Sequence, residues 1–194
     1  SQAMVAVDLP FGSYERSPEQ AFDAASRLLA ETGAQAVKVE AAQGVAESIA
    51  FLTGRGIPVI GHVGLRPQAV HLDGGFKARG RTDVERDRVL AEARATDEAG
   101  AMAMVVESVT PELAADITAA VACPTIGIGA SNACDGQILV TEDMLGLFDW
   151  TPKFVRRYAD LRGTITAAIA AYASDVKAGT FPAEAEEYRL GARA

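Results

Sequence analysis

Two stretches of the chain repeat one arrangement of residues. Residues 33–40 and 100–107 each begin with a glycine, continue with a short apolar run and end with a glutamate, Glu40 or Glu107. Such a short apolar run after a helical pattern predicts a strand of a parallel sheet that is buried on both faces. Residues 4–8 are also a short apolar run, which ends with Asp8. Because α/β proteins carry their chemistry at the carboxyl ends of parallel strands, these three acids predict a functional site.

Helical and strand patterns alternate along the whole chain. We expect strands at residues 4–8, 36–39, 57–60, 102–106 and 124–128, with a weaker sixth at 138–140. Helices are expected at residues 17–32, 45–53, 83–99, 110–121 and 161–176. Units of this kind, each about 30 residues long, indicate a parallel sheet with right-handed crossovers.

Polar residues at the ends of most strands favour a (βα)8 barrel, the TIM barrel, over a doubly wound sheet with its single switch point. Such a barrel normally needs about 250 residues, so the chain is short of it by about two βα units. The glycine-rich stretch Leu65–Arg81 has no period and is predicted to be a long functional loop. No low-complexity linker divides the pattern, so we expect one domain over residues 1–194.

The composition narrows the kinds of partner. The net charge of −8 argues against nucleic acid and anionic membrane surfaces. No apolar run approaches the roughly 20 residues that a membrane span needs. Two cysteines make no disulfide framework, which fits a reducing compartment. We therefore expect a cytoplasmic protein that acts on small molecules.

Asp8, Glu40 and Lys38 are candidates for binding a metal and an anionic substrate. Asp8 and Glu40 supply the hard oxygen ligands that suit Mg²⁺, a cation that takes few carboxylates and keeps several other oxygens. The simpler alternative is that each acid only caps a turn. Lys38 lies two residues before Glu40, so both side chains point to the same face of their strand. It either pairs with a neighbouring acid or binds the anionic end of a substrate.

Glu107 and His62 are the remaining candidates. Val105 and Val106 precede Glu107, and a carboxylate in an apolar setting is suited to act as a general base. His62 is one of two histidines and ends a strand. With no second histidine or cysteine at metal-ligand spacing, it is interpreted as a structural histidine, and a position behind the metal ligands is the alternative.

Six segments in this order give the chain a family resemblance. They are Asp8-Leu-Pro-Phe-Gly-Ser-Tyr14, Val37-Lys-Val-Glu40, Gly61-His-Val-Gly-Leu-Arg-Pro-Gln68, Gly74-Gly-Phe-Lys77, Gly127-Ile-Gly-Ala130 and Asp135-Gly-Gln-Ile-Leu-Val140. On these segments the chain closely resembles the ketopantoate hydroxymethyltransferases (3-methyl-2-oxobutanoate hydroxymethyltransferases) over nearly its whole length.

The resemblance implies a fold, a reaction and roles for the candidate residues. The family fold is a (βα)8 barrel of the phosphoenolpyruvate/pyruvate type, usually assembled as a homo-oligomer, a decamer. The family transfers a hydroxymethyl group from 5,10-methylenetetrahydrofolate to 2-oxoisovalerate with Mg²⁺, in pantothenate and coenzyme A biosynthesis. It implies that Asp8 and Glu40 bind the metal, that Asp8 and Lys38 contact the oxo acid, and that Glu107 accepts the proton.

The chain also departs from the family pattern. The family's first metal aspartate lies in a Gly-Asp-Ser segment that this chain lacks, so we expect a barrel without its first two βα units, with weak Mg²⁺ binding and little activity. Thr110 replaces a family proline, and Ala41 and Ala42 replace glycines. Two other interpretations stay open: an inactive barrel scaffold, and a related Mg²⁺-dependent lyase or mutase that handles 2-oxo acids.

Overall fold

The computed structural model describes residues 3–42, 44–72 and 74–188. The chain divides into two compact units, Ser1–Ile138 and Leu139–Ala194. Each unit is described by itself below. The expectation of one domain over the whole chain stays a prediction.

The first unit is built on a parallel sheet of six strands. The strands are β1 (Ala6–Asp8), β2 (Ala36–Glu40), β3 (Val59–Gly64), β4 (Ala103–Glu107), β5 (Thr125–Ile128) and β6 (Gly136–Gln137). They lie side by side in the order of the sequence, and each pair of neighbours is parallel. The five main expected strands are confirmed within a few residues.

The expected sixth strand at residues 138–140 was wrong in place and length. β6 comes two residues earlier and holds only Gly136 and Gln137. The carboxylate of Asp135 accepts hydrogen bonds from the backbone N–H and the hydroxyl of Thr125, at 2.8 and 2.9 Å. That contact draws the residues directly after Asp135 against β5, ahead of the apolar residues that indicated a strand.

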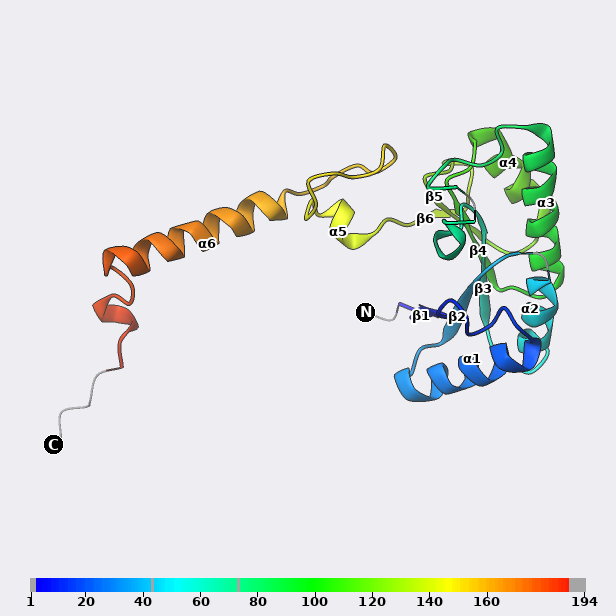
Figure 1. Cartoon of the computed structure of the whole chain (residues 1–194), viewed down its shortest axis with the longest axis horizontal. Helices are drawn as coiled ribbons and strands as arrows, with labels where there is room; N and C mark the ends of the chain where they lie inside the picture. Colours follow the sequence, from blue (N-terminus) through cyan, green and yellow to red (C-terminus); the bar gives the residue numbers. More distant parts are fainter. Residues whose placement is uncertain (1–2, 43, 73, 189–194) are drawn as a thin grey trace. The chain divides into compact units, whose positions relative to one another are not determined.

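Helices α1 (Pro18–Thr32), α2 (Val45–Thr53), α3 (Asp83–Glu98) and α4 (Pro111–Ala120) connect the strands. The expected ends of α1 are confirmed: the Ser17 hydroxyl accepts a hydrogen bond from the backbone N–H of Gln20, and Gly33 ends the helix with a φ of +72°. Thr110, which replaces a family proline, caps α4 by accepting the N–H of Leu113. Figure 1 shows these four helices along one side of the sheet.

Alternate residues of the strands serve two different layers. Val37, Val59 and Met104 point to the helix side, where they pack with residues of α1–α4 such as Ile49 and Leu113. On the opposite face a smaller apolar cluster contains Ala36, Ile60, Ala103, Val105 and Ile128. Strands in sequence order with the connecting helices on one side follow the winding of a barrel, not that of a doubly wound sheet. The first unit is therefore a parallel α/β fold that resembles part of a TIM barrel.

The loop after β3 is long, as expected. Its described part contains one short 3-10 helix, η1 (Pro67–Ala69), and Asp73 lies outside the described residues. Near its end the loop returns to the sheet, where Arg79 forms a parallel bridge with Val109 just beyond β4.

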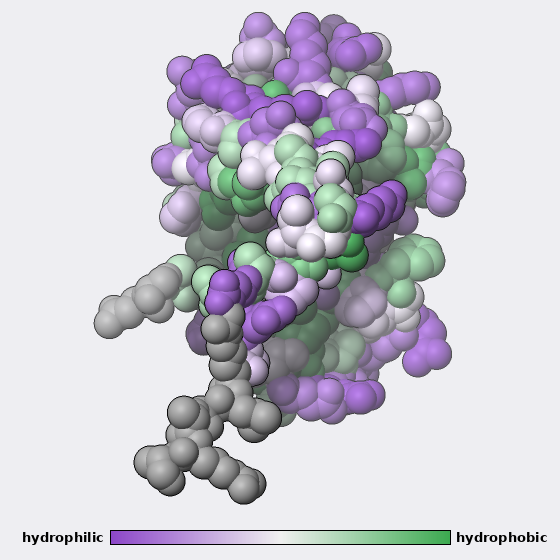
Figure 2. All heavy atoms as spheres, turned by 90° about the vertical axis from the view of Figure 1, so that its left-hand side faces the viewer, coloured by the Kyte–Doolittle hydropathy of each residue, from purple (hydrophilic) through white to green (hydrophobic). Residues whose placement is uncertain are grey.

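The second unit contains α5 (Thr141–Met144), α6 (Leu161–Ala178) and the short 3-10 helix η2 (Glu184–Glu186). The expected helix at residues 161–176 is confirmed and runs two residues further. Its apolar face is exposed, because none of its 18 residues, all of them described, is buried. The face consists of Ile165, Ile169, Tyr172 and Val176. Figure 2 shows apolar residues at the surface among hydrophilic ones on the face drawn there. Within the described part of the chain, no helix has the length and apolar character to cross a membrane.

Candidate functional site

Five polar side chains share the face of the sheet that lies away from the helices. Asp8 is paired in register with Lys38, and Glu40 is paired with His62. Glu107 comes two residues after Val105, which is the register partner of His62. Because side chains alternate between the two faces of a sheet, these pairings place all five on one face, at the carboxyl ends of β1–β4. The structure thus brings together every residue that the sequence marked as a candidate.

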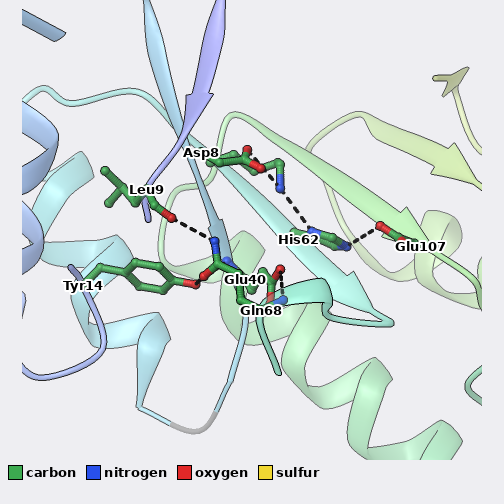
Figure 3. Close-up of polar contacts among 8 residues, drawn as sticks. Asp8, Leu9, Tyr14, Glu40, His62, Gln68 and Glu107 are labelled. Atoms are coloured by element: carbon green, nitrogen blue, oxygen red, sulfur yellow. Dashed lines mark hydrogen bonds and ion pairs between the residues drawn. The ribbon is translucent and has the colours of Figure 1, made fainter. Parts of the chain in front are cut away.

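Four of the five form a continuous row across four strands (Figure 3). Lys38 Nζ lies 3.1 Å from Oδ1 of Asp8 and 3.3 Å from Nδ1 of His62. On the other side of the imidazole, Nε2 lies 3.2 Å from Oε2 of Glu107. This last distance is that of an ion pair, and the ring N–H is not aligned for a hydrogen bond. His62 therefore joins the candidate substrate lysine to the candidate base.

The donors in this row fix where the proton of a neutral His62 ring lies. The ammonium group of Lys38 can only donate, so Nδ1 of His62 is the acceptor of that contact. A neutral ring then carries its proton on Nε2, the nitrogen that faces Glu107. His62 is only 2% exposed, so the ring is held firmly in this orientation. The Nε2 proton of a neutral ring therefore lies on the side that faces Glu107, although it is not aligned for a hydrogen bond to that carboxylate.

Glu40 is held by a separate set of contacts. Both carboxylate oxygens accept the backbone N–H of Gln68, at 3.0 and 3.2 Å, and the side chain is almost fully buried. Burial raises the pKa of Glu40 above its usual value, although the Gln68 N–H and the positive charges of Lys38 and Arg66 oppose the rise. Tyr14 contacts the same residue: its hydroxyl oxygen accepts the backbone N–H of Glu40 at 3.3 Å.

The backbone around Glu107 is fixed by the loop that follows β3. The N–H of Leu65 donates to the carbonyl oxygen of Glu107 at 2.9 Å, and the N–H of Arg79 donates to that of Ser108 at 2.8 Å. Ser108 has a φ of +48°, which is uncommon for a residue with a side chain. Gly64 permits the close approach, since a Cβ there would overlap the carbonyl oxygen of Glu107 and lie 2.8 Å from Cγ1 of Val109. Both ends of the expected functional loop therefore position the candidate base.

Asp8 and Glu40 are chemically suited to a hard divalent cation. They offer carboxylate oxygens from neighbouring strands on one face, and Mg²⁺ is commonly held by one or two carboxylates with water and substrate oxygens. Asp8 is about half exposed and so has room for a further ligand on its outer side. Within the described residues no group of three or more His, Cys, Asp or Glu side chains forms a ready metal site. A cation here therefore needs oxygens from the substrate or water in addition to these two acids.

The sequence analysis gave no role to Tyr14 or Gln68, which the structure places around Glu40. The hydroxyl of Tyr14 donates to Oε1 of Gln68 at 2.8 Å, and Nε2 of Gln68 donates to the carbonyl oxygen of Leu9 at 2.9 Å. Both residues lie in loops after strand ends, in two of the segments that carry the family resemblance. Their position in loops that follow β1 and β3 was the available signal, but only the fold shows that the two loops meet.

The comparisons with known proteins identify the family of the chain. The family model described as ketopantoate hydroxymethyltransferase matches residues 1–184. This chain belongs to the ketopantoate hydroxymethyltransferase family. The expected family resemblance is thereby confirmed, and with it the assignment of the chain to a family of transferases.

Individual relatives support the same assignment. A 3-methyl-2-oxobutanoate hydroxymethyltransferase of Hyphomonas neptunium is 65% identical over 190 residues, covering 98% of this chain and 69% of the relative. One of Phenylobacterium zucineum is 67% identical over 187 residues, covering 96% of this chain and 68% of the relative. The chain thus spans about two thirds of the length of these members of the ketopantoate hydroxymethyltransferase family.

Solved structures give a weaker likeness. A phosphonopyruvate hydrolase matches with a TM-score of 0.49 and 16% identity, over 96% of this chain and 65% of that protein. A score at that level carries no argument about the fold or the function of this member of the ketopantoate hydroxymethyltransferase family.

Proposed function

We propose that the protein containing this chain transfers a hydroxymethyl group from 5,10-methylenetetrahydrofolate to 2-oxoisovalerate and forms ketopantoate. Family membership supports the reaction, and one structural observation supports the assignment of roles. That observation is the row in which His62 joins Lys38 to Glu107 on the open face of the sheet. The ammonium group of Lys38, which would bind the substrate, and the carboxylate of Glu107, which would accept its proton, lie on opposite sides of the buried His62 ring.

Lys38 and Asp8 would bind the oxo acid. The ammonium group of Lys38 is partly exposed, with 20% of its side chain accessible, and it attracts the carboxylate of 2-oxoisovalerate. Asp8, 3.1 Å away, holds the lysine side chain in a fixed position so that the ammonium group faces the site. The substrate is then oriented with its C3 carbon toward Glu107.

Glu107 would remove the proton from C3 of 2-oxoisovalerate. Its side chain is 17% exposed, so a substrate can reach it, and Nε2 of His62 lies 3.2 Å from Oε2 of its carboxylate. The C3–H bond breaks, the proton goes to Glu107, and the electron pair forms the enolate. The enolate carbon then bonds to the one-carbon unit of the folate. One water is consumed, tetrahydrofolate leaves, and the new carbon carries the hydroxyl group.

Asp8 and Glu40 are the residues that would hold Mg²⁺. When bound, this ion supplies Lewis-acid polarisation of the keto oxygen, which makes the proton at C3 easier to remove. Glu40 is prepared for that role because Gln68 and Tyr14 fix its side chain and its backbone. His62 lies beside Glu40 in the register of the sheet, and its ring contacts Lys38 and Glu107.

Deuterium exchange at C3 of 2-oxoisovalerate tests this assignment. We expect the full-length protein with Mg²⁺ and without folate to exchange this proton in D2O. Glu107→Gln should slow the exchange by about 10²- to 10⁴-fold, the usual contribution of a general base. Glu112→Gln makes the same chemical change at an exposed residue in the first turn of α4 and should leave the rate unchanged. Exchange at the normal rate in Glu107→Gln would refute the role of the base, and none in the wild-type protein would favour an inactive scaffold.

The finer fold and the assembly belong to the same proposal. We propose that the six-stranded sheet is part of a (βα)8 barrel of the phosphoenolpyruvate/pyruvate type in which two further βα units precede β1. We also propose a cytoplasmic homo-oligomer without nucleic acid or membrane partners. The exposed apolar face of α6 supports self-association, because contiguous apolar patches commonly mark interaction surfaces.

A further inference from the structure

Residues from three separate segments are joined by hydrogen bonds beside Glu40. Tyr14, Gln68 and Glu40 form a closed ring, and the carbonyl oxygen of Leu9 is attached to this ring through Gln68 (Figure 3). The segments are the loop after β1, the end of β2 and the 3-10 helix after β3. We propose that Tyr14 and Gln68 are positioning residues that set the direction of the Glu40 carboxylate relative to the end of β1. The inference rests on the proposed role of Glu40 as a ligand of the cation.

The hydrogen-bonding capacities of the groups determine each donor in the ring. The carbonyl oxygen of Leu9 can only accept, so the amide group of Gln68 must present its NH2 to it. The amide oxygen of Gln68 then faces Tyr14, whose hydroxyl must donate to it. The same hydroxyl oxygen accepts the backbone N–H of Glu40. Only one assignment of amide orientation and hydroxyl proton satisfies all these contacts.

Gln68 acts on Glu40 from two sides. Its side chain reaches Glu40 through Tyr14, and its backbone N–H donates to both oxygens of the Glu40 carboxylate. A carboxylate has about four lone-pair sites, so one N–H shared by both oxygens leaves sites on each oxygen for a cation. The shared N–H lies between the two oxygens, so a cation would bind at the outer lone pair of either oxygen.

The ring also transmits position between strands. Pro67 begins the 3-10 helix that carries Gln68 and restricts its backbone, which makes the loop a firm support. Leu9 directly follows Asp8, so the bond from Gln68 to the Leu9 carbonyl holds the backbone next to the other proposed ligand. Tyr14 is 2% exposed, so its hydroxyl is held in the protein interior between Gln68 and Glu40.

Two nearly isosteric variants test the proposal. Tyr14→Phe and Gln68→Met remove the polar atoms of the ring at similar side-chain volume. We expect each to weaken binding of Mn²⁺, measured by electron paramagnetic resonance without substrate, by 10- to 100-fold, the usual effect of losing a group that orients a metal ligand. Ser13→Ala is the control, because it removes a hydrogen bond to the Pro10 carbonyl in the same loop and touches no member of the ring. It should bind Mn²⁺ like the wild-type protein.

Two further readouts separate positioning from general stability. The double variant should lose much less affinity than the product of the two single losses, because both residues act through one ring. In the metal-free protein, the Glu40 amide proton should exchange with solvent at least 10-fold faster in Tyr14→Phe, while amides of α4 stay unchanged. Folded variants that bind Mn²⁺ like the wild type and protect the Glu40 amide equally would overturn the proposal.

Failure of the proposed reaction would look different. If the wild-type protein binds Mn²⁺ but exchanges no deuterium into 2-oxoisovalerate, the reaction is refuted and the variants still report on the ring. If the wild-type protein does not bind Mn²⁺, the proposal that Tyr14 and Gln68 position Glu40 for a cation is overturned, whatever the amide exchange shows.

Discussion

Replacing Gly64 with alanine should damage both the stability of the first unit and the position of Glu107. Gly64 has a φ of +96°, and a side chain in this left-handed region costs about 1–2 kcal/mol. The new Cβ would also overlap the Glu107 carbonyl oxygen and lie 2.8 Å from Cγ1 of Val109, an overpacking that costs about 1–3 kcal/mol. The sum, about 2–5 kcal/mol, is a large part of the roughly 5–15 kcal/mol by which domains are stable.

The clash bears on the chemistry because the crowded atom belongs to the proposed base. The Leu65 N–H donates to the same Glu107 oxygen, so relieving the overlap must move the end of β3 away from β4. A displacement of about 1 Å at a reacting group can cost about 10²-fold in rate. We therefore expect deuterium exchange at C3 of 2-oxoisovalerate to fall by about that factor in the Gly64→Ala protein that remains folded.

Gly33→Ala provides the matched control, with equilibrium urea unfolding and the exchange rate measured for both variants. Gly33 has a φ of +72° at the end of α1, and nothing lies within 4 Å of the position of its Cβ. It should show the backbone cost alone, about 1–2 kcal/mol, with normal exchange. The reasoning is refuted if Gly64→Ala is no less stable than Gly33→Ala and exchanges at the wild-type rate.

Two further predictions concern regions outside the site. The Asp97 carboxylate accepts the N–H groups of Ala122 and Cys123 at 2.9 Å, and although burial opposes it, these bonds hold the pKa of Asp97 below its usual value. Asp97→Asn should therefore cost about 1 kcal/mol at neutral pH by urea unfolding. Because the pKa of Asp97 is depressed in the folded state, the extra stability of the wild type is present above about pH 4 and is lost as the pH falls through the folded pKa. A difference in unfolding free energy that does not change with pH would contradict this. In α6, Ile169→Glu should lower the mass of the assembly measured by light scattering, whereas Ala167→Glu on the opposite face should not; an unchanged mass in Ile169→Glu would remove the support for self-association through this face.

Much of the fold followed from local patterns that depend only on neighbouring residues. Ser17 and Gly33 marked the ends of α1 because capping is a property of a few consecutive residues. Short apolar runs after turn glycines marked β2 and β4, since a strand buried on both faces needs no alternation. The spacing of Lys38 and Glu40 correctly indicated that both share one face of β2.

The contacts between segments could not be found in this way. Nothing in the sequence states that Glu40 is paired with His62 or that Gln68 reaches Leu9, because register and loop placement depend on packing of the whole sheet. The sequence favoured a structural His62, and only the structure shows that its ring lies between Lys38 and Glu107. The roles of Asp8, Lys38, Glu40 and Glu107 as metal ligands, substrate contacts and base stay predictions.

The row of polar side chains across β1–β4 makes the strands less tolerant of inserted residues than the loops. From Lys38 to His62 and from His62 to Glu107, the position along the sheet advances by two residues. Because successive side chains of a strand point to opposite faces, this spacing of two keeps all three side chains on one face. One extra residue inside β3 would turn His62 toward the helices and separate the lysine from the glutamate, with no change in composition at either end. Loop residues that make no contact with the site can change in number without moving these side chains. We therefore expect that, during evolution, length changes accumulate in such loops and are rejected within the strands.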